Sequence, residues 1–119
     1  PKFTLALLMG RPLTLHGSGK NTRHYLSAPD LAEAILLLVE KGKIGACYNI
    51  GTREEYANVD MARRLCALFG LKPEDVITFV EDRPFNDARY ALTWDRISAL
   101  GWAPRRRLAD DLPAIVQWY

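Results

Sequence analysis

The amino-acid sequence predicts an α/β fold. Short apolar stretches of strand length alternate with longer segments in which apolar residues recur with a helical period. Glycine or proline stands at most of the junctions between them, which is where turns and helix ends are expected. With 119 residues the chain makes about one small domain, and we treat residues 1–119 as a single, partial one.

The first half of the chain is expected to contain two helices and three strands. In order these are a helix over residues 3–9 that ends at Gly10, strands over 13–16 and 23–26 around a turn at 17–19, a helix over 27–41, and a strand over 46–50. Ser27 followed by Asp30 three residues later predicts a capping box, and Pro29 suits the first turn. Gly42 suits a left-handed helix stop. Because residues 31–39 are apolar nearly all round, we expect this helix to be covered on most sides.

The second half is expected to add two more strands and three helices. These are a helix capped by Asn58, with a stripe of Met61, Leu65 and Leu68 and a stop at Gly70, strands over 76–80 and 89–92, a helix over 94–100 and a last helix that carries Leu112, Ile115, Val116 and Tyr119. A proline inside a helix costs about 3 kcal/mol. Pro113 is therefore expected in the first turn of the last helix.

Composition excludes several classes of function. A net charge of +2 is too small to favour nucleic acid or an anionic membrane, and the longest apolar run, residues 35–39, is far below the ~20 residues that span a bilayer. Cys47 and Cys66 lie in apolar patterns, which favours reduced core thiols in a cytoplasmic protein. No ligand-spaced histidines accompany them, so no metal site is expected. The start without methionine and the apolar end at Trp118 and Tyr119 lead us to expect a segment of a longer protein.

The densest functional pattern is residues 82–90, Asp-Arg-Pro-Phe-Asn-Asp-Ala-Arg-Tyr. Arg83 and Arg89 can each bind phosphate or carboxylate oxygens with two N–H groups. The alternative is a cluster of loop salt bridges around the two acids. Other patterns fail: the turn at 17–20 lacks the first glycine and the Ser/Thr of a phosphate loop, and residues 42–45 follow a helix rather than a strand, unlike a dinucleotide fingerprint. The arginines at 105–107 are expected to form a solvated loop.

A series of motifs resembles one family. Asp82-Arg83-Pro84, then Arg89-Tyr90, then Leu-Gly-Trp-x-Pro at 100–104 and a closing Trp-Tyr at 118–119 occur in the order found in the C-terminal half of the nucleoside-diphosphoglucose 4,6-dehydratases, which are extended short-chain dehydrogenase/reductases. Phe85-Asn86 in place of the usual bacterial Gly-His, together with His16, resembles the eukaryotic UDP-glucose enzymes of UDP-rhamnose synthesis.

This resemblance implies the C-terminal substrate-binding portion of a Rossmann-type fold, with the N-terminal dinucleotide-binding half missing. In the family, bound NAD oxidises C4 of the hexose, water is eliminated across C5 and C6, and hydride returns to C6. The NAD site and the catalytic residues lie in the other half, so we expect no catalytic and no cofactor-binding residue here. The expected substrate is UDP-glucose or dTDP-glucose, and the full-length protein is a possible homodimer.

The resemblance also implies substrate-binding residues. Arg23 corresponds to a diphosphate contact, Arg83 corresponds to a ribose or diphosphate contact, and Asn86 could bind phosphate or sugar. The other implied positions are Lys2 at the mouth of the nucleotide pocket, Thr14, Leu15 and His16 along the base pocket, and Asn49 near the nucleotide. Pro29, Ala88 and Pro113 depart from the family pattern. Two alternatives stay open: another extended reductase, such as an epimerase or decarboxylase, and a non-catalytic truncated remnant.

Overall fold

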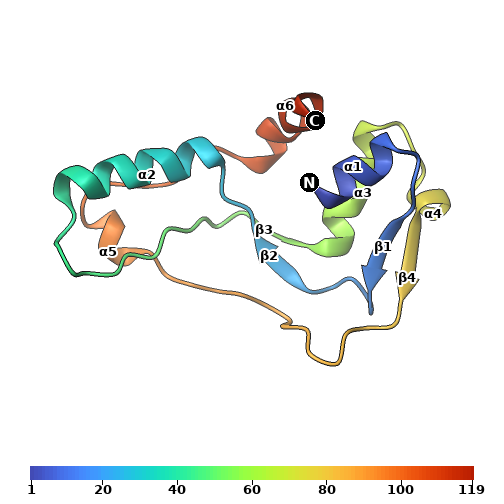
Figure 1. The fold of residues 1–119 in the computed structure, drawn as a ribbon, viewed down its shortest axis with the longest axis horizontal. Coiled ribbons are helices and arrows are strands. Elements are labelled where there is room, and N and C mark those ends of the chain that lie inside the picture. Colours follow the sequence, from blue (N-terminus) through green and yellow to red (C-terminus); the bar gives the residue numbers. More distant parts are fainter. The chain divides into compact units, whose positions relative to one another are not determined.

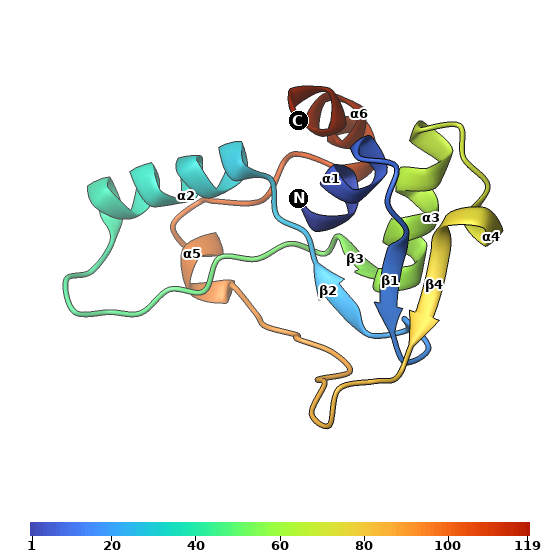
Figure 2. The same ribbon diagram turned by 45° about the vertical axis from the view of Figure 1, so that its right-hand side comes forward.

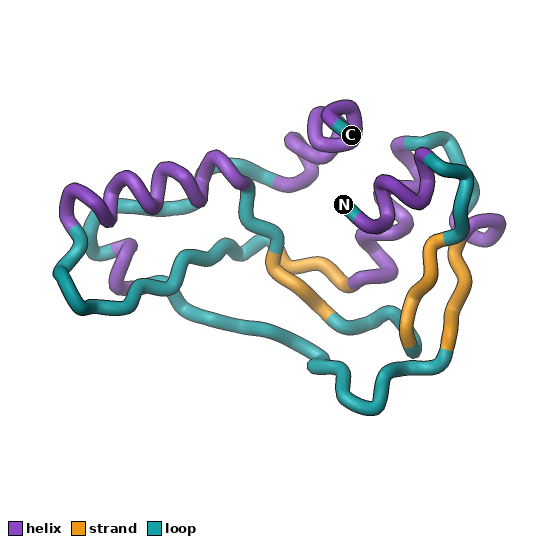
Figure 3. The backbone as a smooth tube through the Cα atoms, viewed as in Figure 1, coloured by secondary structure: helices purple, strands orange, loops and turns teal.

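The computed structural model describes all 119 residues, and they form two compact units (Figures 1 and 3). The first unit holds residues 1–23, 56–90 and 113–119, and the second holds residues 24–55 and 91–112. The elements are α1 (Lys2–Leu8), β1 (Leu13–His16), β2 (Thr22–His24), α2 (Ala28–Lys41), β3 (Glu55–Ala57), α3 (Asn58–Leu68), α4 (Pro73–Val76), β4 (Ile77–Val80), α5 (Asp95–Ser98) and α6 (Leu108–Trp118). The α/β expectation is therefore confirmed.

The first unit is built on a parallel pair of strands, β1 and β4, which run side by side in Figure 2. Leu13 lies opposite Ile77, and the register continues to His16 opposite Val80. Helices α1 and α3 both pack against β1. A helical segment between two parallel strands is the usual connection, because parallel strands cannot be joined by a tight turn.

The core of this unit forms where β1 meets α1 and α3. Leu13 and Leu15 are buried, whereas Thr14 and His16 on the opposite face are partly exposed, which is the alternation of a strand with one buried face. The buried residues of the two helices are Thr4 and Leu7 in α1, and Val59, Met61, Ala62, Leu65 and Cys66 in α3. Burial raises the pKa of the Cys66 thiol, as expected for a core cysteine.

The second unit has its own small core of Ala34 from α2, Ile97 from α5 and Trp102. Partly buried apolar side chains pack around them, namely Leu26, Leu37, Leu38, Tyr48, Ile50 and Trp94. The outer face of α2 is not covered: Leu36 is 64% exposed and Val39 is 80% exposed. The expectation that this helix is covered on most sides is therefore wrong for this chain.

Two expected strands do not form. Residues 46–50 adopt no strand, although their side chains alternate between partly buried and exposed, because no strand of the chain pairs with them. Cys47, in this segment, is exposed rather than part of a core. Of residues 89–92, only Arg89 makes a bridge, to Thr22. The structure instead contains β3 and α4, two short elements that the sequence patterns did not predict.

The ends of helix α2 differ from the expected signals. Ser27 occupies the N-cap position but makes no side-chain cap bond, and Gly42 is extended, with φ −69°. Asp30 does not complete a capping box. Its carboxylate, which is 1% exposed, accepts the backbone N–H groups of Arg105 and Arg106, both at 3.0 Å. A distant segment has therefore taken the acid that the local pattern assigned to the helix start.

The last helix begins earlier than its own sequence suggests. Pro113 lies inside α6 rather than in its first turn, so that expectation is wrong. The Glu54 carboxylate accepts the backbone N–H of Leu108 at 3.2 Å and so caps the helix from another part of the chain. This extra turn places Pro113 in the interior. None of the helices is both long and apolar enough to cross a bilayer.

Candidate functional site

The first unit gathers a cluster of polar side chains from β2 and from the loop that follows β4. Arg23 comes from β2, whereas Arg83 and Tyr90 come from the loop. The Arg23 guanidinium lies over the Tyr90 ring, with Cζ 4.5 Å from the ring centroid. The Arg23 guanidinium also donates to the backbone carbonyl of Asp87, which belongs to the same loop as Arg83. The structure thus brings together two of the predicted site residues.

Backbone carbonyls of the loop hold Arg23 in place. Its Nη1 donates to the carbonyl oxygens of Thr22 at 2.6 Å and Asp87 at 3.1 Å. The Asn21 side-chain amide donates to the same Asp87 oxygen at 3.2 Å, and the backbone N–H of Thr22 donates to Ala88 at 2.8 Å. Three of these bonds, those to Asp87 and Ala88, tie the end of the loop to β2 and to Asn21 before it.

Arg83 is held by a different set of contacts, all within its own loop. Its Nη2 donates to the Asn86 side-chain oxygen at 2.7 Å, and its backbone N–H donates to Asp82 Oδ1 at 2.8 Å. Asn86 Nδ2 donates to the same Asp82 oxygen at 2.7 Å. Asp82, Asn86 and Arg83 therefore form a closed network, and the third predicted site residue, Asn86, lies in it.

Tyr90 completes the arrangement around Arg23. Its hydroxyl donates a hydrogen bond to Asp87 Oδ2. That hydrogen bond raises the pKa of Tyr90, and the negative charge of Asp87 is the second largest cause of the increase. The phenol therefore stays neutral near pH 7, and its ring is a stable surface for the guanidinium.

The end of β1 reaches the start of the same loop. His16 Nδ1 lies 3.3 Å from the Glu81 carbonyl oxygen. Gly17 has φ +57°, and a Cβ at this position would lie 2.6 Å from Asp82 Oδ2. The left-handed conformation favours glycine here, and the Asp82 carboxylate lies close to the same turn.

The other predicted site residues lie elsewhere. Thr14 is half-buried on β1, and Leu15 is 2% exposed within the core of the first unit. Lys2 is exposed at the start of α1, and no hydrogen bond or ion pair joins it to the cluster. Asn49 belongs to the second unit, where its side-chain amide donates to the Thr93 carbonyl oxygen at 3.0 Å.

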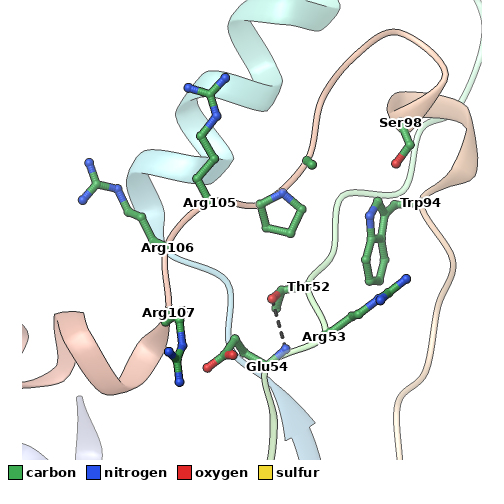
Figure 4. Close-up of a pocket in the computed structure, with 10 residues that line it drawn as sticks. Thr52, Arg53, Glu54, Trp94, Ser98, Arg105, Arg106 and Arg107 are labelled. Atoms are coloured by element: carbon green, nitrogen blue, oxygen red, sulfur yellow. Dashed lines mark hydrogen bonds between the residues drawn. The ribbon is translucent and has the colours of Figure 1, made fainter.

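Sequence patterns did not indicate the pocket of about 400 Å³ in the second unit (Figure 4). Its lining residues are Thr52, Arg53, Glu54, Trp94, Ser98, Ala103, Pro104 and Arg105, Arg106 and Arg107. The Arg105 and Arg106 side chains point away from Thr52 and Trp94 in Figure 4, and Arg105 is 79% exposed. The three arginines do not converge on a ligand there. The side chains of Arg105 and Arg106 are solvated, as the sequence predicted, although their backbone N–H groups bind Asp30.

The chemistry of the cluster in the first unit suits an anion with two phosphates. Arg23 is held against the loop that carries Arg83, and each guanidinium has N–H groups beyond those used in the contacts above. Such groups bind phosphate oxygens in pairs and neutralise their charge. No three His, Cys, Asp or Glu side chains of the chain lie together as metal ligands.

The chain does not provide the features of a dinucleotide site. The glycine-containing turn at residues 17–19 follows β1, but the chain then enters strand β2. A dinucleotide fingerprint requires a helix directly after this turn, because the pyrophosphate binds at the helix N-terminus. The residues present therefore do not fit NAD.

Comparisons with known proteins agree with these observations. Residues 1–51 match the model of the NAD dependent epimerase/dehydratase family. The whole chain is 47% identical to part of the trifunctional UDP-glucose 4,6-dehydratase/UDP-4-keto-6-deoxy-D-glucose 3,5-epimerase/UDP-4-keto-L-rhamnose-reductase of Arabidopsis thaliana, and covers 18% of that protein. It is 38% identical over 124 residues to the dTDP-D-glucose 4,6-dehydratase of Homo sapiens, and covers 35% of it.

A solved structure shows the same fold. The crystal structure of DesIV, a dTDP-glucose 4,6-dehydratase from Streptomyces venezuelae with NAD and TYD bound, matches all of this chain with a TM-score of 0.93 and 33% identity. The chain covers 37% of that structure, so it spans well under half the length of the relatives it matches. The chain is thus homologous to part of the nucleoside-diphosphoglucose 4,6-dehydratases, which are extended short-chain dehydrogenase/reductases.

Proposed function

We propose that this chain is the nucleotide-sugar-binding part of an NAD-dependent nucleoside-diphosphoglucose 4,6-dehydratase. UDP-glucose is the proposed substrate and UDP-4-keto-6-deoxyglucose the product, in nucleotide-sugar and rhamnose biosynthesis. The choice of UDP over dTDP is supported by the higher identity to the Arabidopsis protein, 47%, than to the human one, 38%.

One observation carries this proposal: Arg23, distant in sequence from Arg83, lies against the loop that carries Arg83, through its contacts with Asp87 and Tyr90. In the proposed complex, Arg23 and Arg83 bind the diphosphate, and Asn86 belongs to the same site. A clamped diphosphate fixes the position of the attached hexose, which lowers the entropic cost of the reaction. The proposed base and ribose contacts are Thr14, Leu15 and His16 on β1, with Lys2 and Asn49 as further nucleotide contacts.

The reacting groups are proposed to lie outside this chain. A bound NAD would accept a hydride from the hexose and later return it, and we assign no step of that chemistry to the residues described here. The proposed setting is a cytoplasmic enzyme that forms a homodimer.

The test is an activity assay on the full-length protein with NAD and either UDP-glucose or dTDP-glucose. We expect the 4-keto-6-deoxy product to form, with the higher kcat/KM for UDP-glucose. Residues 1–119 alone are expected to form no product, because they contain no dinucleotide fingerprint and no Tyr-x-x-x-Lys pair. Product from this chain alone, or none from the full-length protein, would contradict the proposal. A preference for dTDP-glucose would overturn only the assignment of the base.

A further inference from the structure

We infer that Asp82 and Asn86 are positioning residues that act on the ligand through Arg83. This inference rests on the proposed function, in which Arg83 binds the diphosphate of a nucleotide sugar. It differs from a direct role for Asn86 in phosphate or sugar binding, which the family resemblance implied.

Each end of the Asn86 amide already makes one hydrogen bond within the loop. Its oxygen accepts from Arg83 Nη2, and its NH₂ group donates to Asp82 Oδ1, both at 2.7 Å. Arginine has only donors and an ionised carboxylate has only acceptors, so the two partners allow one orientation of the amide. Asn86 is therefore a bridge between a carboxylate and a guanidinium. In this arrangement the amide is engaged before any ligand arrives.

Asp82 is the fixed end of this bridge. One of its oxygens accepts both the Asn86 amide and the backbone N–H of Arg83. Its carboxyl group also lies against the turn at Gly17, where a Cβ would be 2.6 Å from Oδ2 and 2.9 Å from Cγ. The carboxylate thus lies beside the turn after β1 and binds both the backbone and, through Asn86, the side chain of Arg83.

The hydrogen bonds among Asp82, Asn86 and Arg83 can strengthen ligand binding by restricting the Arg83 side chain. Arg83 is exposed, and an unrestrained arginine side chain loses much rotational freedom when it binds. A side chain that is already held in one position loses less, so its ligand binds more tightly. The Asp82 carboxylate lies beside Arg83, which in the proposed complex binds a diphosphate. The negative charge of Asp82 therefore opposes diphosphate binding, whereas its hydrogen bonds, which position Arg83, favour diphosphate binding.

Because the charge and the hydrogen bonds of Asp82 have opposite effects on UDP binding, the direction of the change in affinity in an Asp82 variant tells them apart. If Asp82 acts only through its charge, Asp82→Ala removes a repulsion and UDP binds more tightly. If Asp82 positions Arg83, Asp82→Ala weakens UDP binding, by about five- to ten-fold, the size expected for coupled neighbours. Asp82→Asn keeps an acceptor oxygen at the same place and is expected to restore most of the affinity. Tighter binding in Asp82→Ala, or no rescue by Asp82→Asn, would overturn the inference.

A double-mutant cycle in the full-length protein tests Asn86, with UDP as the probe in calorimetric titration. Asn86→Ala is expected to weaken binding about five- to ten-fold when Arg83 is present and by less than about two-fold in the Arg83→Ala protein. An equal loss in both backgrounds would mean that Asn86 contacts the ligand directly, and the inference would be wrong. Thermal unfolding of each variant checks that these exposed-loop changes leave the fold intact.

The cycle also separates the two proposals. If the full-length protein does not bind UDP, or if Arg83→Ala does not weaken UDP binding, both the proposed function and this inference are wrong. If Arg83→Ala weakens binding but neither Asp82→Ala nor Asn86→Ala does, only the positioning role is overturned.

Discussion

The guanidinium of Arg23 stacks on the ring of Tyr90, 4.5 Å from guanidinium carbon to ring centroid, while the Tyr90 hydroxyl hydrogen-bonds Asp87. Asp87 also accepts Arg23 Nη1 through its carbonyl oxygen. Tyr90 and Asp87 together therefore hold the arginine from two sides. Stacking of this kind contributes about 0.5–1 kcal/mol at exposed sites.

We predict that replacement of Tyr90 separates the stacking from the hydrogen bond. Tyr90→Phe keeps the ring beneath Arg23 and is expected to weaken UDP binding by less than ~0.5 kcal/mol. Tyr90→Leu removes the ring and is expected to cost about 0.5–1 kcal/mol. Calorimetric titration with UDP measures both variants. Equal losses in the two variants would mean that the hydroxyl, not the ring, supports Arg23.

We predict that Tyr90 ionises at higher pH than an ordinary tyrosine. The hydrogen bond from the hydroxyl to Asp87, and then the charge of Asp87, favour the protonated phenol and raise the pKa of Tyr90. The protonated phenol therefore contributes to the free energy of unfolding at pH values below tyrosine's ordinary pKa of about 10. This contribution is lost as the pH rises through the raised pKa of Tyr90. Ultraviolet titration should show one late-ionising tyrosine that disappears in Tyr90→Phe. An unchanged titration curve, after allowance for one tyrosine fewer, would contradict this.

Arg23→Ala and Arg83→Ala are each expected to weaken UDP binding by ~1.5–3 kcal/mol, the range for hydrogen bonds to charged groups. The loss should be the same for UDP-glucose, because the diphosphate is common to both ligands. Arg105→Ala is the matched control. Its side chain is 79% exposed in the second unit, and it should change binding by less than ~0.5 kcal/mol. A similar loss in Arg105→Ala would indicate general attraction of charge rather than a specific site.

Alanine substitutions at Gly17 and Gly10 are expected to separate the cost of the left-handed backbone from the cost of a clash with Asp82. Both are left-handed, with φ +57° and +64°, but only a Cβ at Gly17 would meet another group, the Asp82 carboxylate. Each alanine variant should therefore lose about 1 kcal/mol of unfolding free energy for the backbone, and Gly17→Ala should lose about 1 kcal/mol more for the clash. Gly17→Ala alone should also weaken UDP binding. Urea unfolding and calorimetry measure the two effects, and equal results for the two glycines would refute the prediction.

Asp30 is expected to be a main support of the second unit. Asp30→Ala leaves the backbone N–H groups of Arg105 and Arg106 without their carboxylate acceptor, and should lower the unfolding free energy by about 2–4 kcal/mol. Asp30→Asn keeps one acceptor oxygen and should lose about half as much. Urea unfolding decides between these values. If Asp30→Ala has no effect, the two N–H groups are satisfied by water.

The outer face of α2 should make residues 1–119 self-associate when they are produced alone. Leu36 and Val39 are 64% and 80% exposed on an apolar helix, and exposed apolar patches of this kind favour association. Leu36→Lys with Val39→Lys should reduce both association and the binding of an apolar dye, while the unfolding free energy changes by less than ~1 kcal/mol. Sedimentation and dye fluorescence measure this, and a monodisperse unmodified chain would contradict it.

The sequence by itself determined those elements whose signals are local. The helix near the N-terminus, the strand at 13–16 and the strand that ends at Val80 follow from local apolar patterns, and Gly10 and Gly17 mark where the first two end. Of the predicted stripe in α3, Met61 and Leu65 are buried, whereas Leu68 is exposed. The sequence also singled out residues 82–90, because an unusual density of charge in a loop is visible without coordinates.

Only the tertiary structure decided where the polar groups find their partners. The local pattern assigns Asp30 to a capping box, yet its carboxylate accepts the backbone N–H groups of Arg105 and Arg106, which are 75 and 76 positions away in the sequence. Glu54 caps α6 at Leu108, which is 54 positions away. Residues 46–50 have a strand's composition but no partner strand. The hydrogen bonds of Asn86 to Arg83 and Asp82 are likewise not visible in the sequence. The physical reason is the same in each case: a hydrogen bond depends on distance in space, and sequence separation does not reveal that distance.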